Sequence, residues 1–303
     1  MAEITAAMVM KLREQTGAAM MLCKEALKEN DGDSEAATVW IRKKLGNKMA
    51  GATDRTAAEG IISIVVVDNQ DAAIIELNSE TDFVARNDDF KAFAKELAQH
   101  VVQSKGHNVE TVLSEGSLHE DGKTVQNRLE DVYTKLREKI VFKRFEFIST
   151  DEKGLIAAYV HVPSNDKLGV LVELEAASPE AAKSDAAQVV GRELAMQIAA
   201  SKPKYASRED VPAKILEQEK EIAMETARNE GRPEAAMEKI VEGRVRKFYE
   251  EQVLVDQAWL REPKKSVAGV LKEAGLTLRR YVRYSVGDAT GVSASGSIKE
   301  TAE

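Results

Sequence analysis

The sequence predicts an α+β protein with a small helical module followed by a duplicated antiparallel core, and an internal repeat is the main reason for this prediction. Gly60-Ile-Ile-Ser-Ile-Val-Val-Val67 resembles Gly154-Leu-Ile-Ala-Ala-Tyr-Val-His161. Ile74-Ile75-Glu76-Leu77 resembles Leu171-Val172-Glu173-Leu174, which lies 97 residues later. Apolar runs joined by a short turn are typical of an antiparallel hairpin. Two such hairpins, each followed by a helical pattern, predict two copies of one α+β unit.

The residues before the repeat predict three short helices and a linker. We expect the helices to run from Thr5 to near Gly17, from Met20 to Glu29, and from a cap at Asp33 or Ser34 to a point before Gly46. Six of the nine methionines fall in or just after this module, which is typical of an adaptable binding surface but equally of a gap-filled small core. Asn47 to Glu59 reads as the linker.

The second copy is longer than the first. Phe142 to Phe147 resembles Leu278 to Arg283 at an offset of 136, so 39 residues have been added before the last strand. Charged helical segments at 210–228 and 234–250 flank the turn Asn229-Glu-Gly-Arg-Pro233 and predict an inserted helical hairpin, or coiled-coil arm. A narrow apolar stripe that includes Ile215, Ile222 and Met237 is expected where the two helices pack on each other. The expected domains are therefore 1–54, 55–150 and 151–290, with the arm at about 207–250 and a flexible tail at 291–303.

Composition restricts the class of partner. A net charge of −8 argues against binding a nucleic acid or an anionic membrane through a general positive field. Cys23, the single cysteine, cannot form an internal disulfide, and the N-terminal residues lack the pattern of a signal or transit peptide. No apolar run reaches the roughly 18 residues of a membrane span. We expect a reduced, cytoplasmic protein that contacts neither nucleic acid nor membrane directly.

One aromatic residue has no counterpart in the repeat. At an offset of 97, Thr81-Asp82-Phe83-Val84 corresponds to Ser178-Pro179-Glu180-Ala181, which has the composition of an ordinary helix start. Phe83 thus occupies a position where the second copy has a charged residue and where solvent exposure is expected. It either turns inward and packs on Phe90 or Phe93, or it stays exposed to fill the pocket of another protein.

Taken together, these segments resemble the bacterial elongation factor Ts family, whose members act on elongation factor Tu. The resemblance covers nearly the whole chain and rests on Leu12-Arg-Glu-Gln-Thr-Gly17 with Met20-Met-Leu-Cys-Lys-Glu-Ala-Leu27, on Thr81-Asp-Phe-Val-Ala-Arg-Asn87, and on 231–244. It departs near Glu262-Pro263, which is followed here by two lysines. The resemblance implies a UBA-like N-terminal module and a guanine nucleotide exchange factor that needs no cofactor, binds no metal and performs no covalent chemistry.

The resemblance also implies a mechanism and a set of contacts. Thr81, Asp82, Phe83 and Val84 would dislocate Mg²⁺ from elongation factor Tu, with Phe83 as a wedge in an apolar gap and Asp82 as its polar companion. The release of GDP would then let GTP bind during translation elongation. Lys24, His161 and Leu260 match other positions that contact the partner in the family, although each also fits an ordinary surface or strand residue. Whether two factor chains associate in the complex is left open.

Two other classes of function remain as alternatives. The acids around Phe83 could belong to an enzyme, but acids at a helix start are ordinarily caps, and no histidine or nucleophile accompanies them at a telling spacing. Gly116 to Thr124 superficially resembles a phosphate-binding loop, yet it has one residue too many between its glycines and carries acids. A non-catalytic scaffold that binds a GTPase through the arm is the second alternative.

Overall fold

The computed structural model describes residues 4–16, 18–50, 56–288 and 292–295. The chain divides into two units. The first unit contains residues 1–65, 73–147 and 162–167, and the second contains 66–72, 148–161 and 168–303. The linker predicted around 47–59 falls partly on residues 51–55, which lie outside the described residues.

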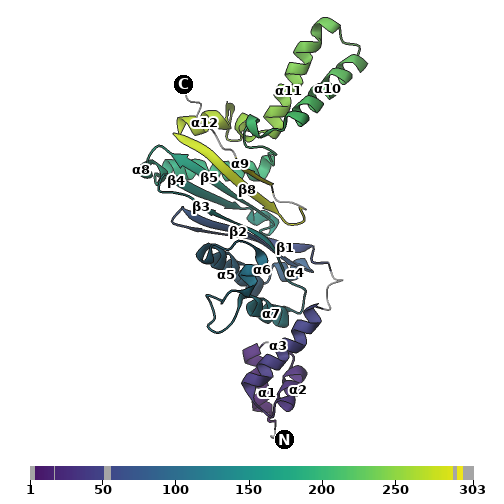
Figure 1. Cartoon of the computed structure of the whole chain (residues 1–303), viewed down its shortest axis with the longest axis vertical. Coiled ribbons are helices and arrows are strands. Elements are labelled where there is room, and N and C mark those ends of the chain that lie inside the picture. Colours follow the sequence, from purple (N-terminus) through teal and green to yellow (C-terminus); the bar gives the residue numbers. More distant parts are fainter. Residues whose placement is uncertain (1–3, 17, 51–55, 289–291, 296–303) are drawn as a thin grey trace. The chain divides into compact units, whose positions relative to one another are not determined.

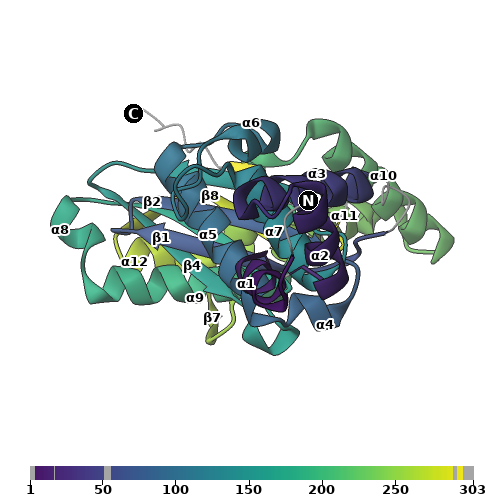
Figure 2. The ribbon, with the colours of Figure 1, turned by 90° about the horizontal axis from the view of Figure 1, so that it is seen from below.

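The first unit begins with three packed helices (Figure 2). They are α1 (Ala6–Thr16), α2 (Met20–Glu29) and α3 (Ser34–Ala50). Leu12, Cys23 and Leu27 are buried among them, so the thiol of the single cysteine belongs to a small apolar core. α3 continues past Gly46, where the sequence predicts its end, because Lys48, Met49 and Ala50 are residue types that favour helix.

The core of the first unit contains a three-stranded sheet of order β1-β2-β3 covered by helices (Figure 1). Its elements are β1 (Glu59–Val67), β2 (Asp71–Ser79), α4 (Asp82–Ala85), α5 (Asp88–Ser104), α6 (Val109–Ser114), α7 (Val125–Leu136) and β3 (Val141–Ser149). α5 buries Phe90, Phe93, Leu97 and Val101, whose spacing of three and four residues forms one helix face. That face packs on the apolar side chains of β1 and β2.

The second unit repeats this plan with a four-stranded sheet of order β4-β5-β8-β9. Its strands are β4 (Gly154–Val160), β5 (Leu168–Ala176), β8 (Leu276–Ser285) and β9 (Val292–Ser295), all paired antiparallel. α8 (Pro179–Ala182) and α9 (Asp185–Ser201) follow β5, and α9 packs against β4 and β5. The sequence predicts three strands and a flexible tail, whereas Val292–Ser295 forms an additional strand beside β8.

The two helices that follow the hairpin have the same lengths and equivalent starting positions in both copies. α5 and α9 are each 17 residues long and begin 97 residues apart, at Asp88 and Asp185. Both end at a lysine in the left-handed region, with φ of 52° at Lys105 and 48° at Lys202. α4 and α8 likewise begin at equivalent positions and each contain four residues. The repeat read from the sequence is therefore a repeat of structure.

Inserted elements separate α9 from β8. They include η2 (Arg208–Asp210), α10 (Ala213–Asn229), η3 (Glu234–Ala236), α11 (Met237–Gln252), η4 (Leu254–Asp256), β6 (Ala258–Trp259), β7 (Glu262–Ser266) and α12 (Val267–Glu273). α10 and α11 pack as a hairpin, with Ala223, Ala227 and Met237 buried (Figure 1). Ile222, which the sequence analysis assigns to the same apolar stripe, faces solvent instead.

Within the residues described, none of the helices has the length and apolar character that crossing a membrane requires.

Candidate partner-binding site

The candidate site is the four-residue helix α4 that carries Phe83. Its N-cap is Thr81, which has extended backbone angles and whose Oγ1 accepts a hydrogen bond from the Val84 N–H at 3.4 Å. Asn87 then caps α5, because its Oδ1 accepts a bond from the Asp89 N–H at 2.9 Å. Val84 and Ala85 are buried in the core of the first unit. The turn is thus anchored by two apolar side chains and bounded by two caps.

Phe83 projects from this turn into solvent. Its side chain is 83% exposed, the largest value among the large apolar side chains in the described part of the chain. Phe90 and Phe93 are buried inside the core that α4 covers. The alternative in which Phe83 packs inward on these rings is therefore wrong. An apolar ring held in water costs free energy unless something else covers it.

Asp82 lies beside Phe83 and forms an ion pair within the turn. The Arg86 guanidinium donates to Asp82 Oδ2 at 2.9 Å, and the side chains of Arg86 and Asp82 are 57% and 40% exposed. An exposed pair of this kind contributes little to stability and is readily exchanged for another partner. The Asp82 carboxylate therefore remains available to an approaching protein.

The equivalent turn of the second copy has the same backbone but other side chains. Ser178 Oγ accepts a hydrogen bond from the Ala181 N–H at 3.2 Å, and Pro179 occupies the first helical position. Glu180, the counterpart of Phe83, points into solvent, and its own backbone N–H and the Ser178 hydroxyl lower the pKa of its carboxyl. This turn is an ordinary helix start.

A second segment of the first unit contacts the turn that carries Phe83. Glu138, in the loop between α7 and β3, accepts hydrogen bonds from the Thr81 N–H at 3.0 Å and from the Thr81 hydroxyl at 2.7 Å. Glu80 in turn accepts a bond from the Lys139 N–H at 2.6 Å. Ser79 Oγ donates to the Thr81 carbonyl at 2.9 Å. Thr81 is therefore held through its N–H, its hydroxyl and its carbonyl.

The other three predicted contacts lie on separate elements. Lys24 is exposed on α2 in the first unit. His161 follows β4 in the second unit, where its Nδ1 lies 2.7 Å from the Tyr159 hydroxyl. Leu260, 57% exposed, is at the tip of the β6–β7 hairpin, and its N–H donates to Gln197 Oε1 at 2.9 Å. Only Thr81, Asp82, Phe83 and Val84 are brought together in one turn.

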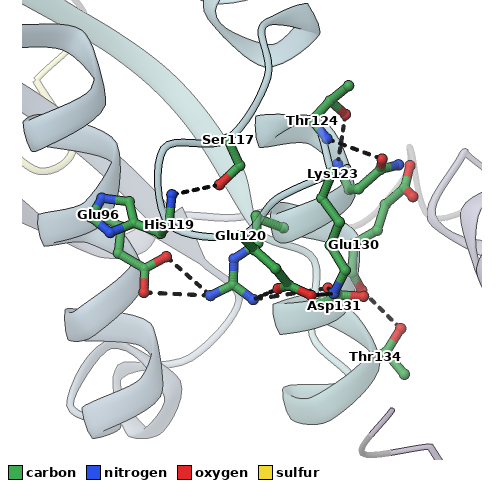
Figure 3. Close-up of polar contacts among 11 residues, drawn as sticks. Glu96, Ser117, His119, Glu120, Lys123, Thr124, Glu130, Asp131 and Thr134 are labelled. Carbon is green, nitrogen blue, oxygen red and sulfur yellow. Dashed lines mark hydrogen bonds and ion pairs between the residues drawn. The ribbon is translucent and has the colours of Figure 1, made fainter. Parts of the chain in front are cut away.

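The loop from Gly116 to Thr124, which superficially resembles a phosphate-binding segment, contacts other side chains of the protein through Lys123 and Thr124 (Figure 3). Lys123 forms ion pairs with Glu120 and with Asp131, the latter at 2.6 Å. Thr124 caps α7 through reciprocal hydrogen bonds with Asn127. The lysine and the threonine that a phosphate would need are therefore engaged in structure.

Arg128 is at the centre of the same network and contacts Glu96 and Glu120 at 3.0 Å each. Burial opposes its charge, but hydrogen bonding and attraction from Glu96, with Glu120 and Asp131, outweigh burial and raise the pKa of the guanidinium. No group of three or more metal-ligating side chains was found among the described residues.

The sequence did not identify Glu138 or Gln197. Glu138 contacts a residue 57 positions away, and Gln197 contacts Leu260, 63 positions away. No local spacing marks either residue, so only knowledge of which elements pack together could have revealed them.

An exposed aromatic turn on a duplicated α+β scaffold is typical of the class of proteins that bind another protein. Two comparisons with known proteins agree with this class. Residues 80–288 match the family model described as "Elongation factor TS". The chain is also 44% identical over 292 residues to "Elongation factor Ts" of Thermobifida fusca (strain YX), covering 95% of this chain and all of that protein. The chain belongs to the elongation factor Ts family, which acts in translation elongation as an exchange factor.

Proposed function

We propose that this chain promotes the release of GDP from elongation factor Tu by inserting Phe83 into the GTPase domain of its partner. The exposure of Phe83 on an otherwise anchored turn is the observation that supports the proposal. Truncation of a central aromatic contact typically removes much of the energy of an interface. The family to which the chain belongs supplies the partner and the general class of activity.

In the proposed mechanism each residue of the turn has one task. Phe83 enters an apolar gap between helices of the partner, while buried Val84 prevents the turn from being pushed away. Asp82 exchanges its contact with Arg86 for contacts near the Mg²⁺ site of the partner. Mg²⁺ neutralises charge on the diphosphate, so its displacement weakens the hold of elongation factor Tu on GDP.

Reciprocity then determines the direction of exchange. A factor that lowers the affinity of its partner for GDP must itself bind less tightly when GDP is present, by the same factor. Rebinding of either nucleotide therefore expels the factor. Nucleotide concentrations in the cytoplasm set the net direction, and GTP replaces GDP without any cofactor or covalent step.

Lys24, His161 and Leu260 are proposed as additional contacts with elongation factor Tu. Lys24 would contribute from the UBA-like module, and the other two from the second unit. The exposure of Lys24 and Leu260 supports this assignment. The net charge of −8 supports a partner that is a protein and not a nucleic acid.

The test measures release of a fluorescent GDP from elongation factor Tu. We expect Phe83→Ala to slow stimulated release by about 30-fold, which corresponds to the loss of about 2 kcal/mol from an aromatic contact. Glu180→Ala, at the equivalent position of the second copy, is the matched control. With this variant GDP should leave elongation factor Tu as fast as with the wild-type factor. A Phe83→Ala variant as fast as the wild type would refute the assigned role.

A scaffold that binds elongation factor Tu without exchange is a second candidate. The exposure of Ile222 and Met224 on α10 supports it, because exposed apolar side chains on a helical arm fit an interaction surface. The two functions differ in nucleotide dependence. A scaffold binds the GDP-bound and nucleotide-free partner equally, whereas an exchange factor binds the nucleotide-free form more tightly.

A further inference from the structure

Two carboxylates link the turn that presents Phe83 to the loop between α7 and β3, and each of the two segments supplies one of them. Glu138 accepts two hydrogen bonds from Thr81, at 3.0 Å from its N–H and at 2.7 Å from its hydroxyl. Glu80 accepts the N–H of Lys139, the residue after Glu138, at 2.6 Å. Each segment thus supplies a carboxylate to a backbone N–H of the other. Bonds of this type are shorter and stronger than those between neutral groups.

The turn gains little stability from its own hydrogen bonds because it is short. A helix of four residues does not persist through its own hydrogen bonds, since nucleation of a helix is unfavourable. The cap bond inside the turn, from the Val84 N–H to Thr81 Oγ1, is long at 3.4 Å, and the backbone bond from the Ala85 N–H to the Thr81 carbonyl is 3.2 Å. Thr81, Glu80 and Glu138 are all partly buried, so solvent screens their contacts less than it screens surface pairs.

The second copy lacks such an arrangement among its described residues. Ser178 there forms hydrogen bonds with Glu180, Ala181 and Ala182, all from its own turn. That turn presents the charged side chain of Glu180, which is stable in water and needs no restraint to stay exposed. An exposed phenylalanine instead gains free energy by folding onto nearby apolar surface, so the turn that carries it requires an external restraint.

We infer that Glu138 and Glu80 are positioning residues for nucleotide exchange: they fix Thr81 so that Phe83 stays extended before the partner arrives. This inference rests on the proposed function of Phe83. A restraint already present in the free factor lowers the entropy cost of docking. Neither carboxylate needs to contact elongation factor Tu, because both act through the backbone of the turn.

The first part of the test examines the free protein, independently of exchange. Amide hydrogen exchange at Thr81 and Val84 should be at least about tenfold faster in Glu138→Ala than in the wild type, because the bond that protects the Thr81 N–H is gone. Amides in the middle of α5, such as that of Leu97, should exchange as in the wild type. Unchanged protection at Thr81 would overturn the positioning role, whatever Phe83 does.

The second part measures GDP release from elongation factor Tu at a factor concentration well below saturation, where the rate depends on docking. We expect Glu138→Ala to slow this rate by about tenfold, as loss of a charge-assisted bond implies. Glu138→Gln should recover most of the rate, because its amide oxygen accepts the Thr81 N–H and its NH₂ donates to the Thr81 hydroxyl. Ser178→Ala removes the cap of the equivalent turn in the second copy and should leave the rate unchanged.

A double variant separates positioning from direct contact. In the Phe83→Ala background, Glu138→Ala should have no further effect on GDP release, because the ring it positions is absent. Independent, multiplicative losses would overturn the inference and indicate that Glu138 touches the partner itself. If Phe83→Ala alone exchanges like the wild type, the proposed function fails, while the amide exchange experiment still decides whether Glu138 holds the turn.

Discussion

The turns Thr81–Val84 and Ser178–Ala181 have the same backbone structure but carry different side chains. Each begins with an extended hydroxyl-bearing cap that accepts a hydrogen bond from the residue three positions on. Each lies between a strand and a 17-residue helix. One presents an 83% exposed phenylalanine and the other presents a glutamate. The scaffold therefore tolerates a charged residue at this position and does not itself require the ring in the first copy.

The side chains also differ at other equivalent positions of the two copies, and each difference predicts a measurable effect on stability. The largest concerns the ion pair that joins the second strand of each copy to its partner strand. Glu76 is fully buried and contacts Lys143 and Arg144, at 3.1 and 2.6 Å. Glu173, its counterpart, contacts Arg280 at 2.6 Å but is 14% exposed.

We expect Glu76→Ala to lower the free energy of unfolding by about 3 kcal/mol, because it leaves cationic groups without their buried partner. Glu173→Ala should cost about 1–2 kcal/mol, since Arg280 can turn towards solvent. Urea unfolding of both variants makes the comparison, and Glu76→Gln should give an intermediate loss. An equal loss of unfolding free energy in Glu76→Ala and Glu173→Ala would show that the greater burial of Glu76 does not make its ion pairs more stabilising.

The next effect concerns Tyr281 in β8, whose counterpart in β3 is Phe145. The buried Tyr281 hydroxyl donates to the Pro203 carbonyl at 2.9 Å. Tyr281→Phe makes the second copy resemble the first and should lower the free energy of unfolding by about 1 kcal/mol. Thermal unfolding at neutral pH measures this loss.

The same variant should change the response to alkali. Burial, with a contribution from Asp210, raises the pKa of Tyr281. A raised pKa in the folded state means that the stabilisation is present below the unfolded value of about 10 and is lost as pH rises above it. The wild type should therefore lose stability faster than Tyr281→Phe above about pH 10. Parallel curves for the two proteins would show that this hydroxyl is not coupled to folding.

The sequence predicted the duplicated elements because each copy has its own local signals. Apolar runs mark β1 and β4, and caps mark the starts of α5 and α9. Elements without a counterpart were harder to predict. β9 has only four residues and depends on pairing with β8, and Ile222 faces solvent although its spacing fits the apolar stripe of α10. Contacts between distant segments decide such cases.

The candidate site was predictable to a similar extent. Comparison of the two copies singled out Phe83 as exposed, which the structure confirms. The restraint by Glu138 could not be predicted, because it joins positions 81 and 138 through the packing of a loop against a turn. The roles of Lys24, His161 and Leu260 remain predictions, since each lies on a different element.

Phe83→Glu tests the central claim most directly, because it places the residue of the second copy at the equivalent position of the first. The variant should unfold at the same urea concentration as the wild type, or slightly higher, since an acid replaces an exposed ring at a helix N-terminus. Stimulated release of fluorescent GDP from elongation factor Tu should fall by about 30-fold or more. A variant that loses several kcal/mol of stability, or that still releases GDP at the wild-type rate, would contradict the account.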